Sequence, residues 1–258
     1  MSLPAGHCAS CARHALIPWL CCPFVLHGTR VLPGLNPDAL VHKMAAIASY
    51  SSTTVEQLSR QVAPVIRRGG LVAIPTETFY GLGVNPFDAR ALDRLRAVKG
   101  RDDAKPILVL VGSLNDLPAF AEDVPPAASI LIEAFWPGPL TILFPARHSL
   151  PLALTAGGLV GVRLSSCRPL CELLERVGPL TGTSANRAGA PPARTADAVQ
   201  QAFGDAVDLI LDAGPAPGGL PSTVVDAQES LRIVREGAIG RSVIEATLRQ
   251  RGFSLKNS

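Results

Sequence analysis

The sequence has few charged residues and no long uninterrupted apolar run, and each shortage excludes a class of protein. Only 17% of the 258 residues are Asp, Glu, Lys or Arg, whereas 47% are hydrophobic. A long disordered chain needs the opposite balance, so we expect a folded chain with a substantial core. No apolar run reaches the roughly 20 residues of a membrane-spanning helix. We therefore expect a cytoplasmic protein without a membrane partner.

Histidine and the common catalytic signatures are also scarce. His148 is the only histidine after Met44, which argues against a histidine-based nucleophile system or a metal cluster in most of the chain. The Walker A motif is absent, so the chain is not a P-loop enzyme. The G-x-G-x-x-G, H-E-x-x-H and G-x-S-x-G patterns are absent as well.

Cysteine is concentrated at the start of the chain, where four of the six residues lie within the first 22 positions. The stretch "HCASCARH" contains a C-x2-C pair with flanking histidines, so a zinc site there is one interpretation. No second pair with ligand spacing follows it, and we therefore predict no metal site. Cys167 and Cys171 are four residues apart in a predicted helix, where we expect them to be small buried or half-buried side chains.

The first 43 residues differ in composition from the rest, because they contain a single acidic residue and scattered prolines. Ordinary patterning begins after Met44. We predict a poorly ordered leader over residues 1–49, one α/β domain over 50–248 and a C-terminal tail over 249–258. The leader also fits an upstream start, with Met44 as the true one.

Helical and strand patterns alternate along the domain, which is typical of an α/β fold. Thr53 and Glu56 have the spacing of a capping box and predict a helix that ends at Gly69 and Gly70. Asp88 and Gly100 enclose a second predicted helix. Further helices are expected over 127–135, 168–177, 195–204 and 240–252, and strands over 71–74, 106–111, 139–144, 160–164, 207–211, 222–227 and 231–236. Because the last third is rich in strands, we expect a mixed sheet.

Four polar stretches stand at strand ends or in loops: "PTETFYG", "KGRDDAKP", "TGTSAN" and "GGLPSTVVD". Hydroxyls, an amide, two cations and glycines suit the binding and positioning of anions, as in phosphoryl and nucleotidyl transfer. The mild positive charge of +3 fits an anionic ligand or RNA. Each stretch also has a plainer explanation, namely a polar turn, a cationic helix end favoured by the helix dipole, a side-chain-closed loop or a flexible loop.

Seven motifs together resemble a known family. "PTETFYGLG", "KGRDDAKP", "FWPGPLT", "VGVRLSS", "TSAN", "STVVD" and "IVREG" occur in the order and spacing of the YrdC/YciO family, from about Gly69 to Gly237. The resemblance implies a twisted mixed β-sheet with helices packed around it and a concave ligand cavity. The "K-x-R" of Lys99 and Arg101 and the "SAN" motif resemble the synthase branch, in its short single-domain form.

The resemblance implies a nucleotidyltransferase that makes threonylcarbamoyl-AMP and pyrophosphate from L-threonine, bicarbonate and ATP, with Mg2+ on the phosphates. It implies that a transferase complex then passes the threonylcarbamoyl group to tRNA, at the adenosine beside the anticodon. The implied threonine-binding residues are Thr78, Arg163, Ser184 and Ser222, and the implied ATP-binding residues are Arg101, Asn186, Thr195 and Arg235. Lys99 and Arg101 are the implied catalytic residues, and we expect both at an exposed helix end.

Two positions depart from the family pattern. Lys105 stands where the family often has asparagine, and "RAGAPPART" is one residue longer than usual, which bears on the role of Thr195. The main alternative function is a non-catalytic module that binds tRNA or double-stranded RNA, although the chain lacks a dense Lys/Arg stripe. A carbamoyl-handling domain of the hydrogenase-maturation type is a third interpretation.

Overall fold

The computed structural model describes residues 45–50, 53–100, 107–228 and 231–256. The chain divides into two compact units, Met1–Val41 and His42–Ser258, and every described residue belongs to the second unit. The cysteine and histidine cluster of the leader therefore lies outside the described residues. No helix in the described ranges is long and apolar enough to cross a membrane.

The helices begin and end at residues that satisfy their backbone groups. The α-helices are α1 (Val55–Arg67), α2 (Ala89–Lys99), α3 (Pro126–Phe135), α4 (Arg168–Val177), α5 (Ala196–Phe203) and α6 (Arg241–Arg249), with 3-10 turns η2 (Leu114–Ala119) and η3 (Gly204–Ala206). As predicted, Asp88 caps α2 by accepting from Arg90 N and Ala91 N, and Gly100 ends it with φ 63°. The cap of α1 was predicted one residue too early. Thr54, not Thr53, accepts from Gln57 N, and the Gln57 side chain returns to the backbone of Thr54.

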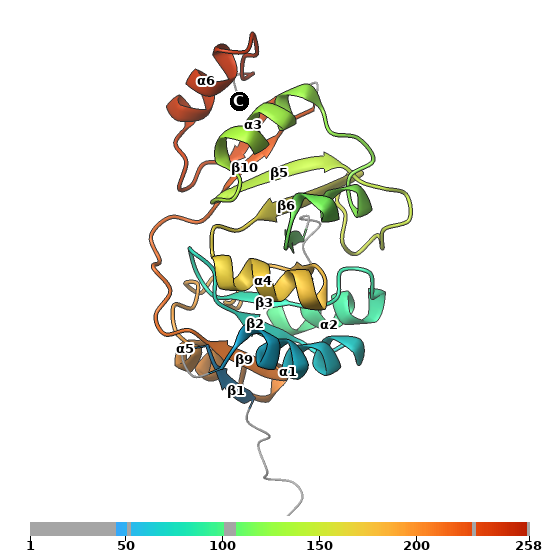
Figure 1. The fold of residues 1–258 in the computed structure, drawn as a ribbon, viewed down its shortest axis with the longest axis vertical. Coiled ribbons are helices and arrows are strands. Elements are labelled where there is room, and N and C mark those ends of the chain that lie inside the picture. The colour runs from blue at the N-terminus through green and yellow to red at the C-terminus, as the bar shows by residue number, and fades with distance from the viewer. Residues whose placement is uncertain (1–44, 51–52, 101–106, 229–230, 257–258) are drawn as a thin grey trace, which may run out of the picture. The chain divides into compact units, whose positions relative to one another are not determined.

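The strands form two mixed sheets (Figure 1). One has the order β1 (Ala46–Ser49), β9 (Leu209–Asp212), β2 (Val72–Ile74), β3 (Gly81–Gly83), β8 (Thr183–Ser184). The other has the order β11 (Arg232–Arg235), β10 (Thr223–Asp226), β5 (Leu140–Pro145), β6 (Leu159–Leu164), β4 (Leu108–Val111), β7 (Leu180–Thr181). The α/β class and the mixed pairing are confirmed, but the single expected sheet is in fact two.

The chain passes from one sheet to the other at Gly182. Thr181 pairs with Val109 in the second sheet, whereas Thr183 pairs with Leu82 in the first. A Cβ on Gly182 would lie 2.5 Å from the side chain of Leu110, so only glycine fits this crossing without a shift of that side chain. The "TGTSAN" stretch therefore brings the two sheets together.

The predicted boundary of the leader at residue 49 is wrong. Ala46–Ser49 form strand β1, which pairs in parallel with β9 along its whole length. The four-residue strand lacks a strong apolar pattern, which explains why the sequence did not reveal it. At the other end of the chain, Phe253 and Leu255 pack against the core.

Apolar side chains fill two clusters. The larger contains Tyr80, Phe120 and Phe144 and covers most of both sheets. The smaller lies where α1 packs on α4 and β2, and α4 packs on β4, and it includes Leu58 and Leu174. Cys167 and Cys171 are half-buried free thiols, as predicted. This packing fixes the ends of β2, β6 and β10 and the start of α4, where the polar motifs lie.

Candidate active site

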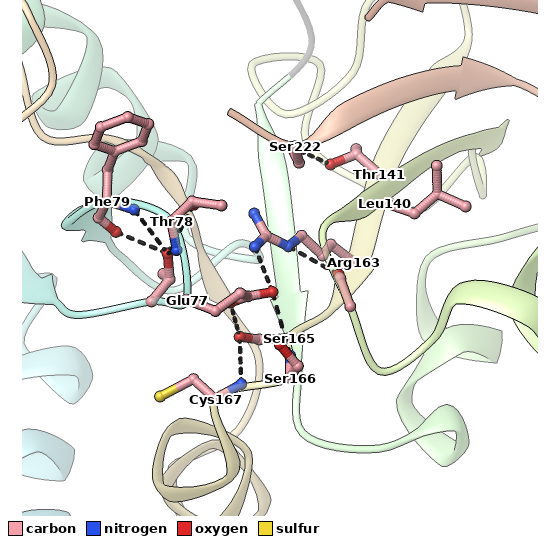
Figure 2. Close-up of polar contacts among 12 residues, drawn as sticks. Glu77, Thr78, Phe79, Leu140, Thr141, Arg163, Ser165, Ser166, Cys167 and Ser222 are labelled. Carbon is pink, nitrogen blue, oxygen red and sulfur yellow. Dashed lines mark hydrogen bonds and ion pairs between the residues drawn. The ribbon is translucent and has the colours of Figure 1, made fainter. Parts of the chain in front are cut away.

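The loop that follows β2 is organised by a threonine hydroxyl. Thr76 Oγ1 donates to Phe79 O (2.7 Å) and accepts from Thr78 N (3.1 Å) and Phe79 N (3.3 Å). It also lies 3.0 Å from Thr78 Oγ1, and both threonines are buried. The predicted turn is therefore present and is closed by this hydroxyl. Glu77 lies between the two threonines in the sequence, and its side chain is directed away from the turn, toward Arg163 (Figure 2).

Glu77 and Arg163 form an ion pair that connects the loop after β2, in the first sheet, to β6, in the second. Arg163 Nη2 lies 2.5 Å from Glu77 Oε1, and the two side chains are 4% and 16% exposed. Arg163 Nε also donates to Gly138 O at 3.2 Å. The carboxylate accepts from Ser166 N (3.2 Å) and from Ser165 Oγ. The "PTET", "FWPG" and "VRLSS" motifs therefore meet at one charge pair.

The environment of Glu77 keeps it ionised at neutral pH. Burial alone would raise the pKa of this carboxyl, but the positive charge of Arg163 and the hydrogen bond from Ser165 outweigh burial, and the pKa lies below its ordinary value. An opposite charge this close favours the charged form of the carboxyl. The pair is therefore a carboxylate with a guanidinium at the pH of the cell.

A second group of hydroxyls lies beside Arg163. The register that pairs Ile142 with Val162 brings Thr141 opposite Arg163 at the next position. Thr141 Oγ1 lies 3.0 Å from Ser222 Oγ, and both residues are buried. In the view of Figure 2 the guanidinium lies between Thr78 on one side and this Thr141–Ser222 pair on the other. Gly218 N donates to Thr78 O at 2.8 Å, which ties the two loops together.

Arg235 reaches the same loop from β11. Its Nη2 donates to Ser222 O (2.9 Å) and lies 3.3 Å from Ser222 Oγ. Thr223 fixes this arrangement, because its Oγ1 donates to Ile239 O and accepts from Gly237 N. The "STVVD" and "REG" motifs are therefore held in contact.

Lys99 lies at the end of α2 but is buried, which corrects the expectation of an exposed helix end. Lys99 is only 4% exposed, and its Nζ donates to Ser184 O at 2.5 Å. A lysine that merely caps the helix dipole would extend into solvent. Lys99 instead connects α2 to the "TSAN" loop.

The "SAN" motif forms a turn closed by its own side chains. Ser184 Oγ donates to Asn186 Oδ1 at 2.5 Å, and Asn186 Nδ2 donates to Ala190 O at 2.8 Å. Ser184 also pairs with Gly81, directly after the "PTETFY" loop. Ser184 is therefore in contact with Lys99 through its carbonyl and is paired with Gly81, three residues after Thr78.

Of the predicted nucleotide contacts, one is a helix cap and another lies outside the described residues. Thr195 is the N-cap of α5, where its Oγ1 accepts from Ala198 N at 3.1 Å. Arg101 and Lys105 lie outside the described residues. The ATP-binding roles of Thr195 and Arg101 stay predictions.

Sequence reasoning missed three side chains at this site: Glu77, Thr141 and Ser165. Each lies inside a motif that was recognised, but none was given a role. Only Thr141 could have been found from the sequence, because it is the one polar residue in the apolar run "PLTILF", and the structure shows it buried. Nothing in the sequence indicates that Glu77 pairs with Arg163.

Within the described ranges there is no group of three or more His, Cys, Asp or Glu side chains placed to hold a metal ion. The charged side chains that contact the motif loops described above are one carboxylate, Glu77, and three cations, Lys99, Arg163 and Arg235. The donor set is suited to carboxylates and phosphates rather than to a resident metal.

Comparison with protein families supports the motif reading. The Sua5/yciO/yrdC family model, described as telomere recombination, matches residues 64–237. A threonylcarbamoyl-AMP synthase of Pyrococcus abyssi is 37% identical over 190 residues, which are 72% of this chain and 55% of that protein. A putative threonylcarbamoyl-AMP synthase of Mycobacterium tuberculosis is 37% identical over 205 residues, which are 78% of this chain and 94% of that protein. The chain therefore spans about half of the first relative and nearly all of the second.

Solved structures give the same picture. The crystal structure of P. abyssi Sua5 complexed with L-threonine superposes with a TM-score of 0.74 at 31% identity, over 83% of this chain and 66% of that one. The structure of Escherichia coli YciO superposes with a TM-score of 0.65 at 24% identity, over 75% of this chain and 95% of that one, and shows the shared fold.

Proposed function

Because the chain belongs to the Sua5/YciO/YrdC family, we propose that it is an L-threonylcarbamoyladenylate synthase. It would form threonylcarbamoyl-AMP and pyrophosphate from L-threonine, bicarbonate and ATP. The observation that carries this proposal is the cluster around Arg163, whose residues lie within the part of the chain that matches the family model. One of these relatives has a crystal structure described as bound to L-threonine.

Threonine would bind at the Arg163 end of the cluster. The guanidinium is a donor for the amino acid's carboxylate, and Arg forms paired hydrogen bonds with such groups. The hydroxyls of Thr78 and Ser222 lie on either side of it (Figure 2). Ser184 would contribute from the "SAN" turn. The methyl group of threonine distinguishes it from serine by roughly 1 kcal/mol or more if it fits an apolar surface.

ATP would bind with its phosphates toward Lys99. This proposal assigns the nucleotide to Arg101, Asn186, Thr195 and Arg235, and assigns charge neutralisation at the reacting phosphate to Lys99 and Arg101. Mg2+ would accompany ATP on its phosphates, where it neutralises charge. We assign no protein ligand to it.

The reaction would proceed in two bond-forming steps. Bicarbonate takes up one proton and loses water to give CO2. The ammonium of bound threonine loses a proton, and the neutral amine then adds to CO2 and loses a second proton, giving a carbamate. A carbamate oxygen then attacks the α-phosphorus, and the bond to the β-phosphate oxygen breaks to release pyrophosphate. Lys99, buried in the site, would stabilise the charge that accumulates between carbamate and phosphate, where a fixed cation lowers the barrier most.

The product would be consumed by a transferase that acts on tRNA. We propose that a threonylcarbamoyl transferase complex in the cytoplasm receives threonylcarbamoyl-AMP and modifies the adenosine beside the anticodon. Binding of tRNA or double-stranded RNA by this chain itself is a separate proposal.

The direct test is pyrophosphate release from ATP. We expect release that requires both L-threonine and bicarbonate, with serine as a poor substitute. Equal release without any amino acid would contradict the synthase. If no release occurs under any condition while the chain still binds tRNA, the non-catalytic RNA-binding module is the better explanation.

A further inference from the structure

The charge of Arg163 is offset inside the site by Glu77. Arg163 is buried and Glu77 is partly buried, and their oppositely charged atoms are 2.5 Å apart. Interactions between charges are several times stronger in such surroundings than in bulk water. A ligand that approaches Arg163 therefore meets a guanidinium whose net field is largely cancelled by the carboxylate next to it.

Glu77 is itself held in place. Its carboxylate accepts from Ser165 Oγ and from Ser166 N, immediately before the first turn of α4. Arg163 has a second anchor, because its Nε donates to Gly138 O. Figure 2 shows the third nitrogen of the guanidinium turned toward Thr78 and Ser222 and away from Glu77. The pair thus presents one edge of the guanidinium in one orientation.

This arrangement matters because the site must separate two kinds of anion. Arginine binds phosphate as readily as carboxylate, and often in the same two-pronged geometry. Threonine is a zwitterion with no net charge, whereas ATP and pyrophosphate carry several negative charges. A fixed carboxylate beside Arg163 repels a polyanion strongly, but it attracts the ammonium of an amino acid. Selectivity of this kind comes from repulsion of the wrong ligand as well as attraction of the right one.

We propose that Glu77 is the specificity-determining residue of the amino-acid end of the site, because it orients Arg163 and cancels its charge so that a zwitterion binds there and phosphates do not. This proposal rests on the proposed function for the identity of the amino acid. The charge argument itself requires only that Arg163 binds an anion.

The test uses the full chain with Glu77→Gln, which keeps the shape of the side chain and removes its charge. Binding of inorganic phosphate is measured by calorimetry with the nucleotide site filled by a non-hydrolysable ATP analogue. We expect phosphate affinity to rise by about tenfold or more, since a neighbouring charge changes anion binding by at least that factor in buried surroundings. In turnover assays, pyrophosphate should become competitive with threonine. The KM for threonine should rise by about tenfold, with kcat changed by less than about threefold.

Glu172→Gln is the matched control. Glu172 lies on α4 and pairs with Arg168, but both side chains are largely exposed, at 44% and 88%. The same loss of one negative charge there should leave phosphate affinity and the KM for threonine unchanged. An equal rise in phosphate affinity in both variants would show a general charge effect and overturn the proposal. An unchanged phosphate affinity in Glu77→Gln would overturn it as well.

Glu77→Asp separates charge from position and replaces Glu77→Gln if that variant does not fold. Aspartate keeps the charge but is one methylene shorter, so Arg163 loses its alignment. We expect a higher KM for threonine with wild-type phosphate affinity. Unchanged KM, or a rise in phosphate affinity, would count against the proposal. The phosphate measurements do not depend on turnover, so they stand even if the wild-type chain releases no pyrophosphate and the proposed function fails.

Discussion

At the scale of single residues, the burial of Lys99 means that a substitution there affects stability as well as activity. A cation at an exposed helix end contributes little to stability, so its loss would affect activity alone. Lys99 is 4% exposed and donates to the carbonyl of Ser184. Its removal would leave that carbonyl without this donor and open a space in the packing. Activity and stability are therefore coupled at this position.

We predict that Lys99→Ala lowers turnover by about a hundredfold or more and lowers the free energy of unfolding by about 1–3 kcal/mol. Steady-state kinetics and urea unfolding of the same preparation measure both quantities. Arg90→Ala is the control, because Arg90 is an exposed cation on the same helix. It should change neither quantity appreciably. Wild-type turnover in a folded Lys99→Ala variant would contradict a role at the reacting phosphate.

At the scale of elements, the ends of helices followed from local chemistry and the pairing of strands did not. Asp88 and Gly100 satisfy the ends of α2 through neighbours within four residues, so the sequence contains the whole interaction. By contrast, β7 and β8 are two-residue strands separated by Gly182, and each joins a different sheet. Their pairing depends on Leu110 and Leu82, far away in sequence, so no local pattern could separate one sheet from two.

The same division explains the site. Thr78, Arg163, Ser184 and Ser222 belong to motifs that could be recognised along the chain. Glu77 could not be assigned from sequence, because its role depends on an ion pair with Arg163, on a different sheet. Lys99 was placed correctly at the end of α2, but its burial depends on the "SAN" loop packing over that end.

The cap of α1 gives a test at this scale. Thr54 accepts from Gln57 N, whereas the preceding Thr53 does not make this contact. We predict that Thr54→Ala lowers the free energy of unfolding by about 1 kcal/mol, the usual contribution of such a cap. Thr53→Ala, the adjacent control with the same chemical change, should have an effect within about 0.5 kcal/mol of zero. Chemical denaturation of the two variants measures the difference. An equal loss of unfolding free energy in both would contradict the assignment of the cap to Thr54.

At the scale of the whole molecule, the two sheets share one site because four of its motifs lie at their junction. Thr78 and Ser184 belong to the first sheet's loops and strands, whereas Arg163 and Ser222 belong to the second. The Glu77–Arg163 pair and the bond from Gly218 N to Thr78 O connect them. A change that weakens either sheet should therefore affect ligand binding as well as stability.

The start of the folded unit gives the last prediction. The family match begins at residue 64, but β1 begins at Ala46 and pairs with β9 throughout its length. Deleting residues 1–43, so that translation starts at Met44, keeps this strand. We expect a melting temperature within about 2 °C of the full chain and unchanged threonine-dependent turnover.

A second truncation, of residues 1–49, serves as the matched comparison. It removes six more residues than the first, and with them β1, including the buried Ala48. The edge of β9 then loses its partner, and each lost backbone hydrogen bond costs about 0.5–1.5 kcal/mol. We expect a fall of about 5 °C or more in melting temperature, since 1 kcal/mol corresponds to roughly 2–4 °C in a domain of this size. A similar fall in the shorter truncation would show that residues 1–43 contribute to the fold. No fall in either would show that β1 contributes nothing measurable to stability, in spite of its pairing.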